Sequence, residues 1–344
     1  MWIRRGLVTL MILLVATGCT RTVSGQARGG EPAPGVDSLF GGDLPDYGQK
    51  LDEDERATLT YARALRRVDP CGFAESLKGI GEVGAYFGNL DGCTVPVKVS
   101  GADETWVDMN LVLDDVSLLP PAFTVGSVPV YDSTDACSFR MVLPLPKHRA
   151  TGKEPVLKVS DYWADLQDAP PHCDLIKSAT TLVAKGLPSS LQVRHSLSAY
   201  PIKLAQRDPC EVLAEYPGQA RDIAPDSLGS PFGCDFTLGN LDYSVQLIAT
   251  AKNYSGYQHE ERDGITYFYY DKSPGDPLNC HAIALVGDAM YGKDRANGSV
   301  RTADGSDPYY PAISVSSFPE DTAHCGQLRE ILDKAVRIFA NSAR

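Results

Sequence analysis

Cysteine is the residue type in this chain whose number and spacing most clearly indicate possible chemistry. The 344 residues include nine cysteines. Thiol groups can attack a substrate, bind a metal ion or pair as disulfides, and the outcome depends on spacing and on the redox compartment. Cys19 stands alone after an N-terminal apolar segment, whereas the other eight form two sets of four. The sets are Cys71, Cys93, Cys137 and Cys173, and Cys210, Cys234, Cys280 and Cys325.

The two sets lie in repeated sequence contexts. Matching cysteines are 139, 141, 143 and 152 residues apart, as expected of a duplicated domain with a few loop insertions. Short motifs recur with them: Asp-Pro-Cys at 69–71 and 208–210, Gly-Cys at 92–93 and 233–234, and His-Cys at 172–173 and 324–325. We therefore expect two tandem repeats, over residues 52–190 and 195–344.

Four cysteines per repeat allow three pairings, and the sequence does not choose among them. We expect sequential pairing, because it keeps every bridge within its repeat and joins a flanking helix to the sheet. Metal ligation is the alternative, since His172, His281 and His324 each adjoin a cysteine. The chain has no C-x-x-C motif and its leader predicts export, so disulfides are favoured and neither a metal site nor a cofactor is expected.

Residues 1–18 have the composition of a signal peptide. Arg4 and Arg5 precede an apolar run that is too short to remain as a membrane span. The run ends in Ala-Thr-Gly-Cys at 16–19, which resembles the lipobox of bacterial lipoprotein precursors. This resemblance implies lipidation of Cys19 and an extracytoplasmic protein anchored to the cell membrane by its acyl chains. An ordinary secretory peptide, with Cys19 an incidental thiol, is the alternative.

Residues 19–51 are rich in glycine and proline and predict a flexible tether between the membrane and the folded repeats. Without residues 1–18 the chain has 30 basic and 44 acidic residues, a net charge of −14. Such an acidic chain is a poor partner for nucleic acid, whose phosphates require clustered Lys and Arg. We therefore expect no nucleic-acid binding.

Apolar periodicity predicts the same order of elements in each repeat. Each Asp-Pro-Cys motif reads as a helix cap followed by proline in the first turn, and an apolar helix begins at the last cysteine of each set. A helix is also expected from about residue 53 to residue 67. Strands are expected between these helices, at 94–99, 105–113 and 137–143 in the first repeat and at 234–238, 243–249, 265–271 and 281–286 in the second. The expected fold class is α+β, with an antiparallel sheet packed against flanking helices in each repeat.

The lipobox, the two Asp-Pro-Cys motifs, the Gly-Cys that follows each of them and the final cysteine before an apolar helix resemble actinobacterial lipoproteins of unknown function. They are also similar, more loosely, to the extracellular sensor domains of mycobacterial serine/threonine kinases. The resemblance covers residues 59–344 as two copies. It implies an envelope location and a binding or sensing role, and it carries over no catalytic residue.

Motifs for catalysis are absent or incomplete. Residues 79–84 fit G-x-G-x-x-G, but they follow a predicted helix and lack the preceding strand of a dinucleotide site, so a turn is favoured. Asp304-Gly305-Ser306-Asp307 lacks the spacing of a calcium loop. No P-loop, G-x-S-x-G or H-E-x-x-H motif is present. We predict no catalytic residues.

Tyrosines in the second repeat give the one indication of a binding surface, because tyrosine is enriched where proteins recognise partners. The candidates are Tyr254, Tyr257, Tyr267, Tyr269, Tyr309 and Tyr310. The alternative is that these rings only cover the sheet. The leading hypothesis is a non-enzymatic binding or accessory lipoprotein for an envelope protein or a small envelope ligand. An envelope hydrolase whose site is assembled only in three dimensions and a structural spacer are the other hypotheses.

Overall fold

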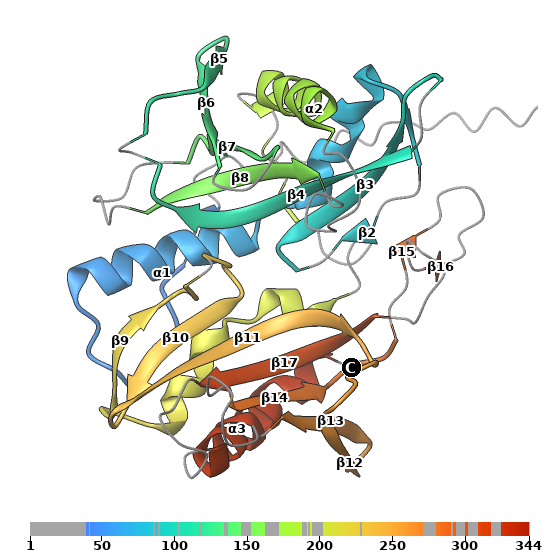
Figure 1. The fold of residues 1–344 in the computed structure, drawn as a ribbon. Coiled ribbons are helices and arrows are strands. Elements are labelled where there is room, and N and C mark those ends of the chain that lie inside the picture. The colour runs from blue at the N-terminus through green and yellow to red at the C-terminus, as the bar shows by residue number, and fades with distance from the viewer. Residues whose placement is uncertain are drawn as a thin grey trace, which may run out of the picture. The chain divides into compact units, whose positions relative to one another are not determined.

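The computed structural model describes most of the chain from residue 39 onward (Figure 1). The described residues are 39–40, 42–84, 87–88, 90–101, 104–116, 119–133, 137–145, 153–161, 172–187, 191, 193–194, 202–227, 229–270, 280–289, 292–293, 300–301, 309–317 and 325–343. The expected signal peptide, Cys19, His324 and residues 304–307 lie outside them. Among the described helices, none is long and apolar enough to cross a bilayer.

Helices lie at the borders of the predicted repeats. The α-helices are α1 (Glu53–Arg66), α2 (Cys173–Gly186) and α3 (Cys325–Ala343), and the 3₁₀ helices are η2 (Pro70–Gly79), η4 (Lys203–Gln206) and η5 (Pro209–Glu215). The segments that begin at the two Asp-Pro-Cys motifs are thus 3₁₀ helices, and α-helical cover of the sheets is limited. Residues 79–84 form the end of η2 and the short strand that follows, not a phosphate loop.

Two antiparallel sheets form the body of the protein. The first contains β1 (Glu82–Val83), β2 (Phe87–Gly88), β3 (Gly92–Lys98), β4 (Glu104–Asp114), β5 (Phe123–Val125), β6 (Val128–Asp132), β7 (Phe139–Val142) and β8 (Glu154–Asp161). The second contains β9 (Ala220–Ala224), β10 (Gly233–Leu238), β11 (Leu241–Ala251), β12 (Gln258–Arg262), β13 (Ile265–Tyr270), β14 (Cys280–Leu285) and β17 (Tyr309–Ser317). A separate pair is made by β15 (Gly292–Lys293) and β16 (Val300–Arg301).

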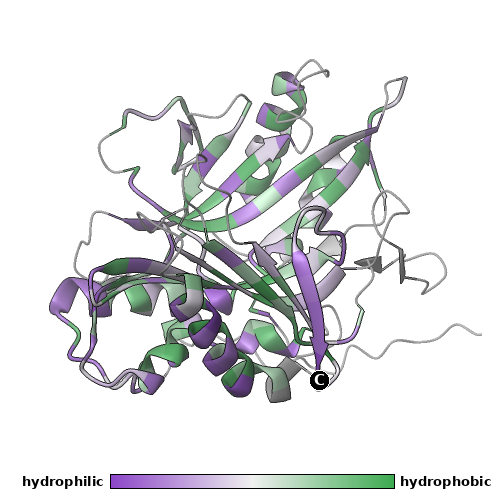
Figure 2. Ribbon diagram, turned by 60° about the horizontal axis from the view of Figure 1, so that its bottom comes forward, coloured by the Kyte–Doolittle hydropathy of each residue, from purple (hydrophilic) through white to green (hydrophobic). Residues whose placement is uncertain are grey.

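The strand orders of the two sheets correspond one to one. The first sheet runs β1-β3-β4-β8-β7-β6-β5, with β2 also paired to β3, and the second runs β9-β10-β11-β17-β14-β13-β12. In both sheets the last long strand in sequence returns to the centre. Apolar and polar residues alternate along β4, and Figure 2 shows this banding on the long strands. The α+β class and the two-part arrangement are therefore confirmed.

All eight paired cysteines are bonded as sequential pairing predicts. The bridges are Cys71–Cys93, Cys137–Cys173, Cys210–Cys234 and Cys280–Cys325. Three of the bridges join a helix to a strand, and Cys137, which pairs with the first residue of α2, lies two residues before β7. The bridges therefore attach the helical borders to the sheets. They leave no thiol of either set for metal binding or for nucleophilic attack.

The recurring motifs have local physical causes. The carboxylates of Asp69 and Asp208 each accept the backbone N–H of the cysteine two residues later, at 3.0 Å, and so cap the 3₁₀ helix. The Gly-Cys motif reflects close packing: a Cβ on Gly92 would lie 2.1 Å from Asn110 Oδ1, and one on Gly233 would lie 2.4 Å from Asp226 Cβ. A side chain at position 92 would require the Asn110 side chain to move, and one at position 233 would displace Asp226 from its Cβ outward.

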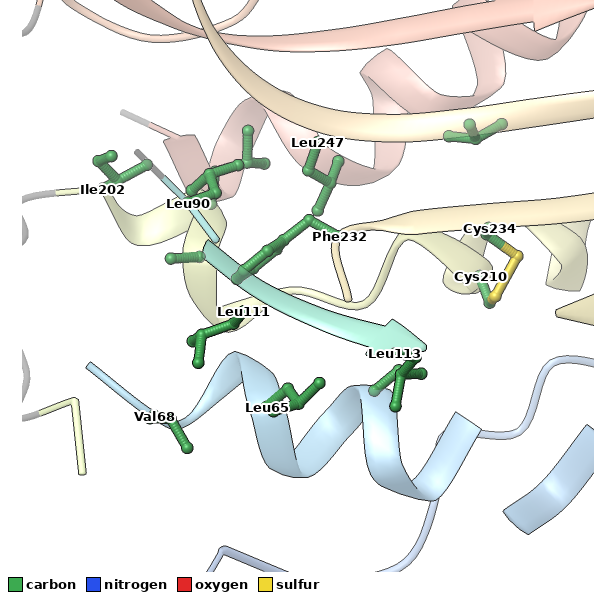
Figure 3. Close-up of a cluster of buried hydrophobic side chains, with 14 of the residues drawn as sticks. Leu65, Val68, Leu90, Leu111, Leu113, Ile202, Cys210, Phe232, Cys234 and Leu247 are labelled. Carbon is green, nitrogen blue, oxygen red and sulfur yellow. A yellow bond between two sulfur atoms is a disulfide. The ribbon is translucent and has the colours of Figure 1, made fainter. Parts of the chain in front are cut away.

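One continuous hydrophobic core includes residues of both predicted repeats. Figure 3 shows its central part, where Leu65 of α1, Leu111 and Leu113 of β4 and Phe232 before β10 gather in one cluster. The backbone N–H of Leu113 donates to Gly229 O at 2.8 Å, which joins the end of β4 in the first repeat to a loop of the second. The repeats are thus parts of one packed body.

The folded part of the protein begins earlier in the sequence than the predicted end of the tether. The tether was predicted to end at residue 51, yet the side chains of Leu39 and Tyr47 are 1% and 2% exposed. Tyr47 donates its hydroxyl to Asp208 Oδ2 at 2.8 Å, and Gln49 Nε2 donates to the carbonyls of Leu213 and Tyr216 at 3.0 and 2.8 Å. Glycine and proline do not prevent packing where buried side chains and hydrogen bonds stabilise the segment, so residues 39–40 and 42–50 belong to the folded body.

Candidate functional site

The six candidate tyrosines do not form one surface. Tyr267 and Tyr269 point into the main core on the face of the second sheet that carries α3, and are 4% and 7% exposed. Arg262 and Arg329 lie over their rings, 4.3 and 4.5 Å from the centroids. These two tyrosines are therefore structural. Side chains alternate between faces along a strand, which also places Tyr309 on the side of the sheet opposite Tyr310.

Tyr254, Tyr257 and Tyr310 pack on the other face of the sheet, around a second small hydrophobic cluster. Its buried members are Phe268, Ile283, Leu285 and Ala312. The ring of Tyr254 lies 5.1 Å from Tyr257 and 5.0 Å from Phe268, and Tyr257 lies 5.1 Å from Tyr270. Tyr254, Tyr257, Tyr270 and Tyr310 are all half-buried. We call Tyr254, Tyr257, Phe268, Tyr270 and Tyr310 the aromatic face.

Strand register explains why these rings meet. Phe268 is paired with Ile283, and Tyr270 with His281, so alternate residues of β13 and β14 stand side by side. The segment between β11 and β12 carries Tyr254 and Tyr257 back over these strands. Gly256 lies in that segment with φ +85°, a conformation that glycine adopts without the strain of a side chain.

His281 connects the aromatic face to the centre of the sheet. Its Nδ1 lies 2.7 Å from the Tyr257 hydroxyl, and its Nε2 lies 2.8 Å from Ser314 Oγ. Tyr254 extends the polar edge of the face through a short hydrogen bond between its hydroxyl and Thr250 Oγ1. The contacts with Tyr257 and Ser314 occupy both ring nitrogens of His281 and fix the orientation of the imidazole.

The hydrogen-bonded side chains of Tyr257, His281 and Ser314 are neutral at physiological pH. Burial lowers the pKa of His281 below its ordinary value, and burial together with the nearby phenols raises the pKa of Tyr257. A neutral imidazole has one donor and one acceptor nitrogen, so the chain Tyr257–His281–Ser314 can be satisfied in either direction without a net charge. The aromatic face is thus uncharged but able to form hydrogen bonds, as partner-binding surfaces often are.

A hydrolase would need His281 to activate Ser314. Two of the three groups of a nucleophilic triad do meet here, but the imidazole is held on its other side by the Tyr257 hydroxyl, whereas triads use a carboxylate. Ser314 also lies in the middle of β17, in register with Gln246 and Ile283 on both sides. Neighbouring backbone amides are thus part of the sheet and are not directed at a developing oxyanion.

Sequence reasoning missed His281 and Ser314 as members of this face. His281 was considered only as a possible metal ligand beside Cys280, and Ser314 was not among the candidate residues. A signal for Ser314 exists, because Ile313 and Val315 alternate with serines as in a strand with one buried face. The contact between Ser314 and His281 itself depends on the pairing of β14 with β17, which no local pattern encodes.

Other expected or excluded chemistry can be placed as well. His172 stands at the start of α2, where its backbone N–H and its Nδ1 each lie 3.1 Å from Asp161 Oδ2. Within the described ranges, no group of three or more His, Cys, Asp or Glu side chains could hold a metal ion.

Comparisons with protein-family models, curated proteins and solved structures found no match for this chain.

Proposed function

We propose that this protein is an extracytoplasmic lipoprotein, anchored to the cell membrane through Cys19, whose two tandem copies of one ancestral domain act as a non-enzymatic binding module. The signal-peptide composition, the lipobox-like residues 16–19 and the actinobacterial lipoprotein resemblance support the anchor. Four disulfides support an oxidising compartment. The matching strand orders support duplication.

We further propose that the aromatic face is the recognition surface and that it binds an envelope protein. The single observation that carries this proposal is the half-buried group of rings, with Tyr257, His281 and Ser314 joined in an uncharged hydrogen-bonded chain. Tyrosine rings give a large contact area at a small entropic cost, and their hydroxyls still bond across an interface.

Site-specific photo-crosslinking in cells tests the recognition surface. A photoreactive phenylalanine analogue placed at Tyr257 or Tyr310 of the full-length protein should give the same discrete protein adduct. The half-buried Tyr131 of the first sheet is the matched control position and should not give it. Equal adducts at Tyr131, or none at either test position, would contradict the assignment and favour a structural spacer.

Substitution of Cys19 tests the anchor separately. We expect the Cys19→Ala variant to lose metabolic labelling by fatty acid and to leave the membrane fraction, because two acyl chains provide the membrane affinity. The wild-type protein is the control. Membrane association that persists unlabelled in Cys19→Ala would mean that another segment or partner anchors the chain.

A further inference from the structure

A short segment between β9 and β10 of the second repeat is bonded to the first repeat. Gly229 O accepts the backbone N–H of Leu113, at the end of β4, at 2.8 Å. Pro231 O accepts Arg66 Nη1, from the last turn of α1, at 2.7 Å. We call residues 229–232 the clamp, because these bonds cross from one repeat to the other.

Two aspartates, one from each repeat, meet at Ser230 in the clamp. Asp91, which precedes β3, accepts the Ser230 hydroxyl at 2.6 Å, and Asp226 Oδ1 accepts the Ser230 backbone N–H at 2.8 Å. The backbone carbonyl of Asp226 also accepts the N–H of Gly229 at 2.8 Å. Ser230 Oγ in turn accepts the N–H of Phe232, whose ring is buried in the core (Figure 3). The conformation of the clamp therefore depends on both carboxyl groups.

Asp226 has little room in which to be solvated. Its side chain belongs to a residue that is 2% exposed, and its Oδ2 accepts Gln246 Nε2 of β11 at 2.7 Å. A Cβ on Gly233 of β10 would lie 2.6 Å from the same Oδ2, so the strand passes directly beside the carboxyl group. A carboxylate in such surroundings has lost most of its hydration, and hydrogen bonds from the protein replace only part of it.

Other charged side chains lie around the clamp in the described part of the chain. They are Arg66 of α1 with its partner Asp208, Lys153 before β8, Arg194, and Asp235 of β10 with its neighbour Asp242. Arg194 favours the charge on Asp91, whereas Asp235 and Asp91 both disfavour the charge on Asp226. Lys153 acts on Asp235. The main charge effects on Asp226 are therefore repulsive.

Burial and repulsion both favour a proton on Asp226. Burial raises its pKa, and the neighbouring carboxylates add to the shift, which brings the pKa to about 6. Burial also raises the pKa of Asp91. A protonated Asp226 still accepts the Ser230 N–H through its carbonyl oxygen, and Gln246 can turn its amide oxygen towards the new O–H group. One proton thus satisfies the closed clamp without a buried charge at Asp226.

We infer that the clamp is a proton-controlled junction between the two repeats, closed while Asp226 is protonated and loosened when Asp226 releases its proton to solvent. Ionised Asp226 and Asp91 repel each other across Ser230, and this repulsion weakens the bonds of the clamp to Leu113 and Arg66. The closed form binds the proton more tightly than the open form, so closure is favoured at low pH and is lost as the pH rises through about 6. The junction is independent of the aromatic face, so either assignment can fail without the other.

Amide hydrogen exchange of the disulfide-bonded protein, followed by NMR at about pH 5 and about pH 7.5, tests this inference. Protection factors are compared, because they correct for the direct effect of pH on exchange. The amides of Leu113 and Leu247 report on the clamp, since they donate to Gly229 O and Phe232 O. We expect their protection to fall about tenfold between the two pH values, as a pKa of about 6 in the closed form and of 3.8 in the open form requires.

Amides inside the sheets separate local opening from global unfolding. Met109 of β4 and Val315 of β17 lie on strands that are paired on both sides. Their protection should exceed that of Leu113 and Leu247 at both pH values, because the clamp opens without unfolding of the sheets. Equal protection of all four amides, or no fall at Leu113 and Leu247, overturns the inference.

Three variants assign the effect to the two aspartates. Asp226→Asn should keep Leu113 and Leu247 protected at about pH 7.5 and remove the tenfold fall. Asp91→Asn removes one source of repulsion, so the fall should move to lower pH, and this variant serves if Asp226→Asn does not fold. The exposed Asp222→Asn, on β9, is the matched control and should behave as the wild type. A full tenfold fall that persists in Asp226→Asn would overturn the inference.

Discussion

The outer faces of the two sheets differ in chemistry although the sheets share one strand order. In the first sheet, Arg140 Nη1 lies 2.6 Å from Asp114 Oδ2, and Lys158 is paired in register with Arg140. The equivalent part of the second sheet has His281 and Ser314, which are uncharged and joined to Tyr257. The shared scaffold therefore tolerates either a charged or an aromatic face. The aromatic face lies on the second sheet, so we assign recognition to the second repeat.

The two Asp-Pro-Cys motifs show the same divergence at a single residue. Asp69 and Asp208 cap their 3₁₀ helices in the same way. Asp208 is buried and also binds Arg66 of α1 and Tyr47 of the N-terminal segment, whereas Asp69 is half-buried. Asp208 thus caps its helix and also joins separate parts of the chain.

Substitution of these two aspartates gives the largest expected contrast. Asp208→Ala should destabilise the protein by about 3–5 kcal/mol, because it leaves the buried Arg66 without its carboxylate. Asp69→Ala should cost less, because Asp69 is half-buried and does not belong to the Arg66 ion pair; loss of a cap alone usually costs about 1 kcal/mol. Chemical denaturation of both variants measures the difference. Equal losses would show that Asp208 is only a cap.

Removal of matched disulfides compares the repeats as scaffolds. The Cys71–Cys93 and Cys210–Cys234 bridges close segments of 22 and 24 residues. The chain-entropy model gives about 3 kcal/mol for each, so the two double Cys→Ala variants should be destabilised similarly. Calorimetric unfolding without reductant provides the comparison. A loss confined to one repeat would mean that the other bridge is redundant with its packing.

Asp226 and Asp91, one from each repeat, should make stability depend on pH. Burial raises the pKa of Asp91, and burial followed by the nearby carboxylates raises that of Asp226 to about 6 from 3.8. The folded state therefore holds both protons more tightly than the unfolded state, and the contribution of Asp226 to stability should fall as pH rises from about 4 to about 6 and then level off.

Asp226→Asn should remove most of this slope and raise stability above pH 6 by up to about 2 kcal/mol. Gln246 donates to Asp226 at 2.7 Å, and rotation of its amide would satisfy the new side chain. Unfolding midpoints across this pH range, with the exposed Asp222→Asn as control, measure the effect. An unchanged slope in Asp226→Asn would assign the pH dependence to other groups.

The smallest expected effect concerns the chain of hydrogen bonds on the aromatic face. Tyr257→Phe keeps the ring contacts but removes the hydroxyl that is hydrogen-bonded to His281, at a cost of about 1 kcal/mol. Tyr131→Phe on the first sheet is the matched control. The pKa of His281, followed by NMR, should change in Tyr257→Phe and not in Tyr131→Phe. No change in that pKa would show that the hydroxyl does not hold the imidazole.

Local sequence signals predicted the parts of the fold that depend on neighbouring residues. The Asp-Pro-Cys caps, the helices that begin at Cys173 and Cys325, and strands such as β3 and β4 depend on local hydrogen bonds and periodicity. The central strands β8 and β17 were missed, although both alternate apolar and polar residues in part. Proline, charge and serine in these segments weaken the local signal, and pairing on both sides stabilises the strands.

The sequence by itself indicated a repeated cysteine pattern and the α+β class, because the cysteine motifs recur in the same order and the apolar periods are local, whereas the choice among three possible disulfide pairings per repeat was decided by the structure. Only the tertiary structure decided that Leu39 and Tyr47 pack onto the body, that Tyr267 and Tyr269 are core residues, and that His281 meets Ser314. Some of these features are contacts between residues that are distant in sequence, and the others depend on which face of a strand is buried. No local pattern encodes either of them.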